Sequence, residues 1–310
     1  MTVTLFTHPA ALAHDTGRFH PECAARIVSV LRALEAPEFA ALRRESAPLA
    51  PLEALTAAHD PAFVRRLLAL APPPGEHYFI DGDTVVSAGT LEAARRAAGA
   101  AMAGVDAVMA ADVSAAFVAM RPPGHHAERA RAMGFCLFNN AAIAALHARA
   151  RYGLRRVAVA DFDVHHGNGT QDIFAADPEL FYASSHQYPC YPGTGAADER
   201  GIAGNVVNAP LPPGAGGAEF RTAWEGVILP QLVAFAPELL ILSAGFDAHA
   251  ADPLAQLRLR EPDFAWVTQA LLAVSDRCCP GRVVSLLEGG YDLDALAASA
   301  AAHVRGLLRL

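Results

Sequence analysis

Four short apolar runs in this chain each end in a cluster of histidine, aspartate or tyrosine, and this recurring pattern restricts the fold more than any other feature. The strands expected from these runs are Ala115–Met120, Val157–Val164, Leu239–Ser243 and Val283–Leu287. They alternate with helical stretches, which is typical of a parallel β-sheet covered by helices on both faces. Ligands bind beyond the carboxyl ends of the strands in such sheets. We therefore expect the four polar clusters to converge in one crevice.

The other elements expected from the sequence complete an alternating α/β chain. Short strands are expected at Val3–Phe6 and Leu180–Ser184. Helices are expected, in chain order, at 24–35, after Asp60-Pro61, and at 90–109, 139–150, 169–176, 219–235, 262–275 and the C-terminal end. The sequence shows neither an internal repeat nor a linker, so residues 1–310 are expected to form a single domain.

The composition argues against some classes of protein. The net charge is −8 and all 24 basic residues are arginine. This acidic balance disfavours nucleic-acid binding or membrane-surface binding as the main activity. The five cysteines lack zinc-finger spacing, and the N-terminal segment lacks the pattern of a secretion signal. A cytoplasmic globular protein with reduced thiols is therefore expected.

The segment Asp161–Thr170 (DFDVHHGNGT) brings two carboxylates and two imidazoles into six residues. If the preceding strand continues into it, Asp161, Asp163 and His165 share one face. Such groups are costly to bury unless a cation pairs with them. Asp163 and His165, joined by Asp247 from another strand end, would give three ligands and an open position, as in catalytic zinc sites. Manganese or iron would accept the same donors.

A second pair of imidazoles, His125 and His126, follows the tight turn of RPPG. Imidazoles beside a metal suit general acid–base chemistry, because their pKa values lie near neutrality. Each ring needs a partner for its second nitrogen, and Asp161 and Asn168 are placed for that role. His166 falls on the opposite strand face and is expected to be structural.

The EGGYD motif at the last strand end places Tyr291 beside two glycines. Its hydroxyl could donate to a developing oxyanion, although an isolated GGY more often marks a core tyrosine at a turn. The loops at 134–136 and 188–195 offer aromatic and small residues that could line a narrow slot. Packed loops without a slot are the alternative.

Six motifs in order, RPPGHHA, GFCLFNN, DFDVHHGNGT, YPGTG, AGFD and EGGYD, resemble the zinc-dependent histone deacetylase superfamily. The RPPGHHA and HHGNG motifs are most similar to those of the class II branch of this superfamily and of bacterial deacetylase-like amidohydrolases. The resemblance runs from Phe6 to the C-terminus. It implies an arginase-like α/β fold with a central eight-stranded, mostly parallel sheet, flanking helices and an active site at the C-terminal strand edge.

The resemblance also implies roles for residues at matching positions. Asp163, His165 and Asp247 would bind one catalytic Zn²⁺. His126 would act as general base and acid, and Tyr291 would donate to the oxyanion. A structural K⁺ would be held by the side chains of Asp161 and Ser184 and by backbone around residues 163, 165 and Ser185, with a second K⁺ near Phe174.

Further roles follow from the same resemblance. His125 would be an electrostatic partner supported by Asp161, and Asn168 would support His126. Arg26 would line an internal channel for acetate. The residues expected to contact the substrate are Gly134, Phe135, Tyr191, Leu254, Gly289 and the rim carboxylate Asp83, for which Asp81 is the less favoured alternative.

Two departures from the family lie close to the residues with assigned roles, and the loops between Pro72 and Tyr78 are also shorter than in larger eukaryotic members. Cys23 and Ala24 replace the Arg and Pro that usually follow the HPE triplet, which puts the shape of that loop in doubt. Asn168 replaces the Asp of class I members and leaves less negative charge behind His126.

The implied activity is hydrolysis of an N-acyl-lysine-type amide in a peptide or protein to an amine and a carboxylate. An acetylpolyamine amidohydrolase acting on a small acyl-amine is the nearest alternative. Polyamine-preferring relatives carry an acid seven residues after the third zinc ligand, where this chain has Leu254, so acyl-lysine is favoured.

A non-catalytic binding protein is disfavoured by the complete set of residues. A di-manganese hydrolase is disfavoured because extra ligands are not evident. The sequence leaves the oligomeric state open, including a homo-oligomer.

Overall fold

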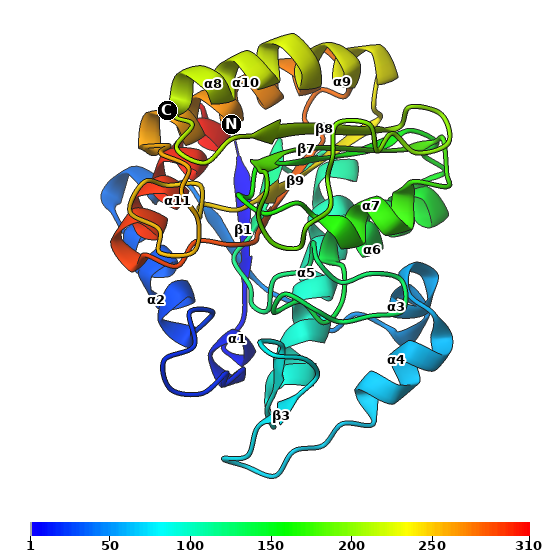
Figure 1. Cartoon of the computed structure of the whole chain (residues 1–310), viewed down its shortest axis with the longest axis vertical. Helices are drawn as coiled ribbons and strands as arrows, with labels where there is room; N and C mark the ends of the chain where they lie inside the picture. The colour runs from blue at the N-terminus through cyan, green and yellow to red at the C-terminus, as the bar shows by residue number, and fades with distance from the viewer. Residues whose placement is uncertain (1) are drawn as a thin grey trace.

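The computed structural model describes residues 2–310 and is built around one eight-stranded sheet (Figure 1). In chain order its strands are β1 (Val3–Thr7), β2 (Arg43–Ser46), β5 (Ala115–Val118), β6 (Val157–Asp161), β7 (Leu180–Gln187), β8 (Val206–Leu211), β9 (Leu239–Ala244) and β10 (Val283–Leu287). Their spatial order is β2-β1-β5-β10-β9-β6-β7-β8, and every neighbouring pair is parallel. The predicted eight-stranded sheet is confirmed, and it is wholly parallel.

The order of the strands explains why distant motifs meet. The four strands that carry the polar clusters, β5, β10, β9 and β6, are consecutive in the middle of the sheet. Every residue of these four strands is buried, as expected for strands covered on both faces. The loops after them therefore leave the same edge of the sheet side by side.

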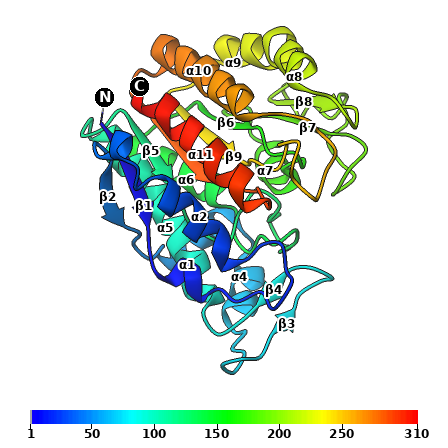
Figure 2. The ribbon, with the colours of Figure 1, turned by 90° about the vertical axis from the view of Figure 1, so that its left-hand side faces the viewer.

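Helices cover both faces of the sheet. They are α1 (Ala10–Ala13), α2 (Ala24–Ala33), α3 (Leu52–Ala58), α4 (Pro61–Leu68), α5 (Thr90–Met109), α6 (Asn140–Tyr152), α7 (Asn168–Phe174), α8 (Gly217–Ala223), α9 (Leu229–Phe235), α10 (Glu261–Cys278) and α11 (Leu293–Leu308). Figure 2 shows α2, α11 and α10 on one side, whereas α5 and α6 pack on the other against β5, β10, β6 and β9. The predicted helical layers are thus present.

The small residues of α5 allow this helix to lie close to the sheet. Gly104 faces Val284 and Ala116, and a Cβ added at Gly104 would lie only 3.0 Å from a methyl of Val284. Helix α4 begins where the Asp60-Pro61 pair predicted. The Asp60 carboxylate accepts hydrogen bonds from the backbone N–H groups of Ala62 and Phe63.

Strand β6 ends at Asp161 rather than continuing to Val164 as predicted. The Asp161 carboxylate accepts the N–H of Asp163 at 3.1 Å, and the Asp163 carboxylate accepts the N–H of His165 at 2.9 Å. These local hydrogen bonds compete with strand pairing and turn the chain. The two-residue periodicity therefore does not explain why Asp163 and His165 lie together.

Other boundaries also differ from the sequence-based expectation. The strand β2 is mostly exposed and polar, and β8 contains Pro210, so neither edge strand has the apolar pattern that marked the central ones. The helix expected at 219–235 begins at Gly217 and contains a π-helical turn over Trp224–Ile228.

A separate two-stranded hairpin, β3 (Tyr78–Phe79) with β4 (Val85–Val86), lies outside the main sheet at its carboxyl end (Figure 1). The acidic loop of residues 81–83 connects its strands. Within residues 2–310, none of the helices combines the length and apolarity that a membrane crossing requires.

Candidate active site

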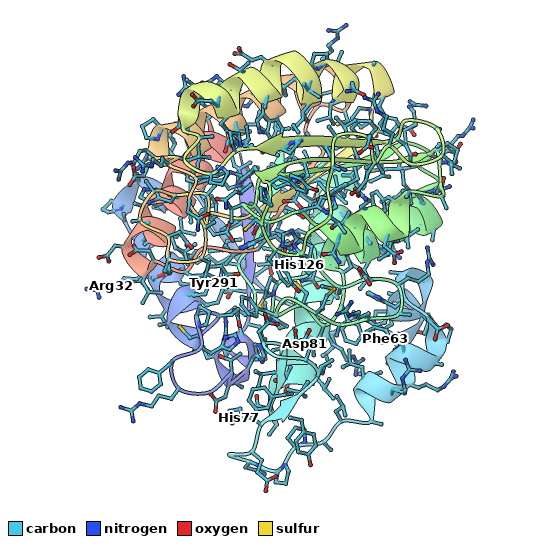
Figure 3. The ribbon with its side chains drawn as sticks, viewed as in Figure 1. Arg32, Phe63, His77, Asp81, His126 and Tyr291 are labelled. Carbon is cyan, nitrogen blue, oxygen red and sulfur yellow. The ribbon has the colours of Figure 1, made fainter. Side chains whose placement is uncertain are left out.

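The loops after β5, β6, β9 and β10 surround one pocket of about 220 Å³. Figure 3 shows His126 and Tyr291 where these loops meet, with Asp81 below them in this view. Every residue that lines the pocket is one to which the sequence assigned a role: Asp83, His126, Gly134, Phe135, His165, Tyr191, Leu254 and Tyr291. The predicted convergence of the four clusters is therefore observed.

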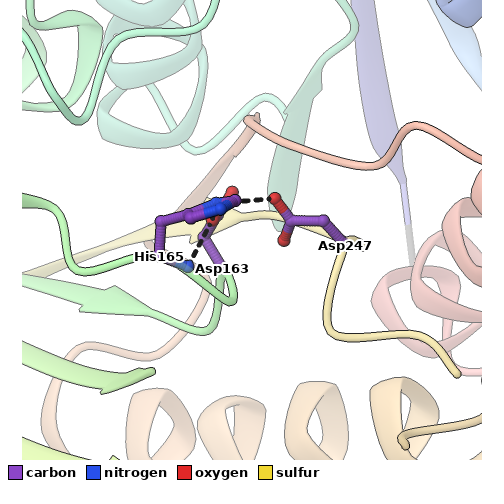
Figure 4. Close-up of side chains that lie close together, drawn as sticks. All are labelled: Asp163, His165 and Asp247. Carbon is purple, nitrogen blue, oxygen red and sulfur yellow. Dashed lines mark hydrogen bonds and ion pairs between the residues drawn. The ribbon is translucent and has the colours of Figure 1, made fainter. Parts of the chain in front are cut away.

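The three predicted metal ligands lie together beside this pocket (Figure 4). Asp163, His165 and Asp247 are buried, and each offers a ligand atom within 4.8 Å of the others. Nδ1 of His165 lies 3.1 Å from Oδ1 of Asp163 and 3.2 Å from Oδ2 of Asp247. Two carboxylates and one imidazole at this spacing match the donor set of a catalytic zinc site.

The electrostatics of these three side chains favour a cation between them. Burial opposes protonation of His165, but the hydrogen-bonded carboxylates of Asp163 and Asp247 outweigh it and raise the His165 pKa well above its usual value. Burial, and then the nearby charge of Asp163, raises the pKa of Asp247 to about 7. Two buried carboxylates so close together are stable only with a positive partner. The residues present therefore fit a divalent metal ion.

The glycines around the ligands are required by close packing. Gly289 donates its N–H to Oδ2 of Asp163 at 2.8 Å. A Cβ at Gly289 would lie 2.0 Å from Oδ2 of Asp247, and one at Gly245 would lie 2.1 Å from Oδ2 of Asp163. Gly289 thus packs against two of the candidate metal ligands, and its expected contact with substrate stays a prediction.

The imidazole of His126 is neutral in this environment. Burial, and then the nearby positive charge of His125 and His165, lowers the pKa of His126 well below its usual value. Nδ1 of His126 lies 2.8 Å from Oδ1 of Asn168. The amide of Asn168 is oriented because its NH₂ group donates to Glu128 at 2.7 Å. His126 must therefore donate from Nδ1, which leaves its Nε2 free to accept a proton.

His125 is held beside a carboxylate rather than an amide. Its Nδ1 lies 3.0 Å from Oδ2 of Asp161, which also accepts the hydroxyl of Tyr182 at 3.1 Å. Burial opposes protonation of His125, but the charges of Asp163 and Asp161 outweigh it and raise the pKa of His125 to about 10. The two adjacent imidazoles thus have opposite protonation preferences. Asp161 and Asn168 lie where the sequence placed them.

Tyr291 lines the pocket and is fixed through its backbone and ring. Its N–H donates to Oδ2 of Asp252 at 2.7 Å, and the guanidinium carbon of Arg26 lies 4.8 Å from its ring centroid. Burial raises the pKa of Tyr291 well above 10, although the charge of Arg26 opposes this shift. The hydroxyl therefore stays protonated and can donate.

Aromatic rings form the walls of the pocket. Tyr191 meets His126 edge to face with centroids 5.0 Å apart, and Phe135 meets Tyr291 in the same way at 5.8 Å. Gly134 has a φ of +56°, and a Cβ there would lie 2.6 Å from the ring of His126. The loops at 134–136 and 188–195 therefore both contribute to the lining of the pocket, through Gly134, Phe135 and Tyr191.

At the rim, the structure distinguishes Asp83 from Asp81. Asp83 lines the pocket, whereas Oδ1 of Asp81 accepts the N–H groups of Asp83 and Thr84 at 3.1 and 2.7 Å. Asp81 therefore folds the loop, and Asp83 is the carboxylate that faces the entrance. Leu254 lies on the same wall and brings no charge to it.

The residues proposed for other sites lie nearby. Arg26 is fully buried and donates to Glu22 and to the backbone carbonyls of Glu288 and Gly290. Its role in a channel stays a prediction.

The two proposed K⁺ sites also stay predictions. Asp161, the last residue of β6, is paired in register with Ser184 in the middle of β7. The hydroxyl of Ser185 accepts a hydrogen bond from Trp224 at 2.9 Å. Phe174, near which the second K⁺ was expected, is buried at the end of α7.

His166, expected to be structural, is buried away from the candidate ligands. Its ring bonds to Thr194 at 2.8 Å and to Gln171 at 2.9 Å, and burial lowers its pKa to about 3. These contacts tie the 188–195 loop to helix α7.

Two buried carboxylates next to the site had no assigned role in the sequence analysis. Glu288 contacts the loop of the histidine pair, and Asp252 holds the backbone of Tyr291. A signal was present for Glu288, because a charged residue directly after a largely apolar strand must be paired if it is buried. The identity of its partners was not readable from the sequence.

Comparisons with known proteins agree with this geometry. The histone deacetylase domain family matches residues 20–307. The histone deacetylase-like amidohydrolase of Pseudomonas aeruginosa is 40% identical over 288 residues, which cover 91% of this chain and 74% of that protein. The polyamine deacetylase HDAC10 of Mus musculus is 43% identical over 228 residues, covering 71% of this chain and 34% of that protein. Among solved structures, the HDA15 HD domain matches with a TM-score of 0.92 at 34% identity, covering 99% of this chain and 88% of that chain.

Proposed function

Because the chain belongs to the histone deacetylase domain family, whose members include deacetylases and amidohydrolases, we propose that it hydrolyses the amide of N-acyl-lysine-type substrates at a zinc site formed by Asp163, His165 and Asp247. One observation carries the proposal. A neutral base (His126) and a protonated tyrosine (Tyr291) face the same narrow pocket as the candidate metal ligand His165. That combination suits the addition of water to an amide carbonyl.

Zinc held by the three ligands would supply Lewis-acid polarisation of the substrate carbonyl and of the attacking water. The remaining chemistry falls to side chains of this chain. His126 accepts a proton at Nε2 as water adds to the carbonyl, because Nδ1 already donates to Asn168. The same nitrogen then returns the proton to the leaving amine, which becomes a good leaving group only when protonated.

Tyr291 and His125 stabilise charge around the reacting carbonyl. The Tyr291 hydroxyl donates to the oxygen that becomes negative, and Arg26 beside its ring favours that negative charge. His126 is kept neutral before the reaction first by its burial and then by the positive charge of His125, which is protonated against Asp161. The two histidines therefore have separate roles.

The pocket walls support a substrate with an extended, uncharged chain. Phe135 and Tyr191 would flank the methylene groups of an acyl-lysine, and Asp83 at the entrance would accept backbone N–H groups of the substrate. The polyamine deacetylase HDAC10 makes an acetylpolyamine the second candidate substrate. Leu254 brings no charge to attract a polyamine ammonium group, and this favours acyl-lysine peptides or proteins.

A panel of substrates tests this proposal. The zinc-loaded protein is expected to turn over an acetyl-lysine peptide with a higher kcat/KM than N-acetylputrescine or acetylspermidine. Peptides with longer acyl groups on the lysine would define the depth of the pocket. A preference for the acetylpolyamines would contradict the substrate assignment but not the chemistry. Stoichiometric zinc without hydrolysis of any acyl amide would instead indicate a non-catalytic binding protein.

The variant Tyr291→Phe tests the assigned chemistry. It removes only the hydroxyl, so zinc binding should be unchanged while kcat falls about 10²–10³-fold, the usual cost of losing one oxyanion donor. Tyr188→Phe is the matched control, because the structure does not place that tyrosine in the lining of the pocket. Equal turnover by Tyr291→Phe and wild type would rule out the role of the hydroxyl.

A further inference from the structure

Glu288 is a buried carboxylate that the proposed chemistry leaves without a role. It follows the last residue of β10, precedes Tyr291 by three residues, and is only 1% exposed. It does not line the pocket. Its carboxylate points instead at the loop that carries the histidine pair, where Oε2 accepts the backbone N–H groups of Gly124 at 2.7 Å and His125 at 3.2 Å. Oε1 accepts the hydroxyl of Ser243 at 3.2 Å.

The same loop is held from its other side by the start of helix α7. The carbonyl of His125 accepts the N–H groups of Gly169 at 3.0 Å and Thr170 at 3.2 Å. The N–H of His125 is thus held by Glu288, and its carbonyl by α7. The side chains of Asp161 and Asn168 fix only the directions of the two rings. The position of the loop along the pocket depends on the backbone contacts.

We propose that Glu288 is a positioning residue that sets the place of His125 and His126 through the reach of its side chain rather than through its charge. Its consequence for catalysis rests on the proposed function. The position of the loop that carries the two histidines can be tested in the metal-free protein, without turnover.

The contacts of Glu288 indicate that the length of its side chain matters more for positioning the loop than its charge does. All three hydrogen-bond donors to the Glu288 carboxylate are neutral, two N–H groups and one hydroxyl, and the protonated ring of His125 acts on it only through space. Burial also raises the pKa of Glu288 to about 7, so the group is not fully charged at neutral pH. A glutamine at this position has the same length. Its carbonyl can accept the two N–H groups while its NH₂ group donates to the oxygen of Ser243.

An aspartate at this position gives the opposite change, because it keeps the charge and shortens the side chain by about 1.5 Å. The carboxylate would then no longer reach Gly124 and His125. Two buried N–H groups would lose their acceptor, and the loop would move to satisfy them. A displacement of about 1 Å in a catalytic group can cost about 10² in rate.

The kinetic test compares Glu288→Asp with Glu288→Gln on an acetyl-lysine peptide at saturating zinc. Glu288→Asp should lower kcat about 100-fold with KM within about threefold, because the ligands and pocket walls are unaltered. Glu288→Gln should keep kcat within about threefold of wild type. Ser243→Ala is the matched control, since it removes the third donor to the same carboxylate and leaves both loop contacts.

A second readout is independent of activity. The hydrogen exchange rates of the Gly124 and His125 amides, followed by NMR in the metal-free protein, should rise in Glu288→Asp and stay near wild type in Glu288→Gln. If wild type hydrolyses no acyl amide, the proposed function fails, and amide exchange still decides the role of Glu288.

Three results would overturn the inference. These are a loss of kcat or of amide protection in Glu288→Gln, wild-type behaviour in a folded Glu288→Asp, and equal effects of Ser243→Ala and Glu288→Asp. The first would show that the charge matters and applies even if Glu288→Asp does not fold. The second would show that reach is irrelevant. The third would show that the two loop contacts have no special role.

Discussion

Two buried groups of charged side chains lie next to each other in this protein, and they balance charge in opposite ways. The metal cluster, Asp163, His165 and Asp247, has two carboxylates and one imidazole beside the pocket. The Glu22 network has one carboxylate between two guanidinium groups, those of Arg26 at 2.9 Å and Arg121 at 2.5 Å. The first has an excess of negative charge and the second an excess of positive charge.

The pKa shifts follow this difference. In the metal cluster, burial and Asp163 raise the pKa of Asp247 to about 7, so its proton is held near neutral pH. Burial also opposes ionisation of Glu22, but Arg121, His14 and Arg26 outweigh it and hold the Glu22 pKa well below its usual range. A cluster that depends on an added cation is suited to bind a metal. A network that supplies its own cations is suited to support the fold.

The largest effect that tests this comparison is expected for Asp247→Asn. The amide keeps an acceptor for the N–H of Val164, which Asp247 now binds at 2.9 Å, but it removes a ligand charge. Zinc affinity should fall by more than about 10²-fold and turnover should be lost with it. The metal-free protein should unfold at the same urea concentration as wild type, because Asp247 is already partly protonated at pH 7. A large loss of stability of the metal-free protein would show that the cluster also supports the fold.

The next effect is expected for Glu22→Ala, which leaves Arg26 and Arg121 buried without their carboxylate. Removing one partner of a buried ion pair typically costs about 3–5 kcal/mol of unfolding free energy. Urea unfolding of the metal-free protein measures it. The control is Glu38→Ala, which breaks the exposed pair with Arg305 and should change little. Similar midpoints for the two variants would remove the distinction between the two groups.

Much of the site could be predicted because its residues lie in the loops that follow the carboxyl ends of four neighbouring parallel strands. Each of these residues lies within eight positions of the end of a central strand, so the order of the strands is enough to bring them to one edge: His125, His126, Asp163, Asp247 and Tyr291. The turn that ends β6 at Asp161 was not predictable in the same way. It depends on side-chain hydrogen bonds from Asp161 and Asp163 to backbone N–H groups, which override the strand pattern.

The supporting carboxylates were hidden for a different reason. Glu288 bonds to Gly124 across 164 residues, and Glu22 bonds to Arg121 across 99 residues. No periodicity or local spacing connects such pairs, because the contact exists only once the sheet order is known. The edge strands were missed because β2 is polar and mostly exposed and β8 contains Asn208 and Pro210, so neither has the continuous apolar run of the central strands.

The smallest expected effect concerns the pH dependence of the stability that Glu22 contributes to the fold. The folded-state pKa of Glu22 lies below its unfolded value, so its contribution to stability is complete above the unfolded pKa, near 4.5. It is lost as the pH falls through the folded pKa, with a slope of up to about 1.4 kcal/mol per pH unit. Glu22→Gln imitates the protonated side chain and lacks this slope. The difference in unfolding free energy between wild type and Glu22→Gln should therefore be constant from pH 7 to 5 and shrink below about pH 4.5. Urea unfolding at these pH values measures the difference. A difference that stays constant down to pH 3 would mean that the ionised carboxylate is not what the two arginines require.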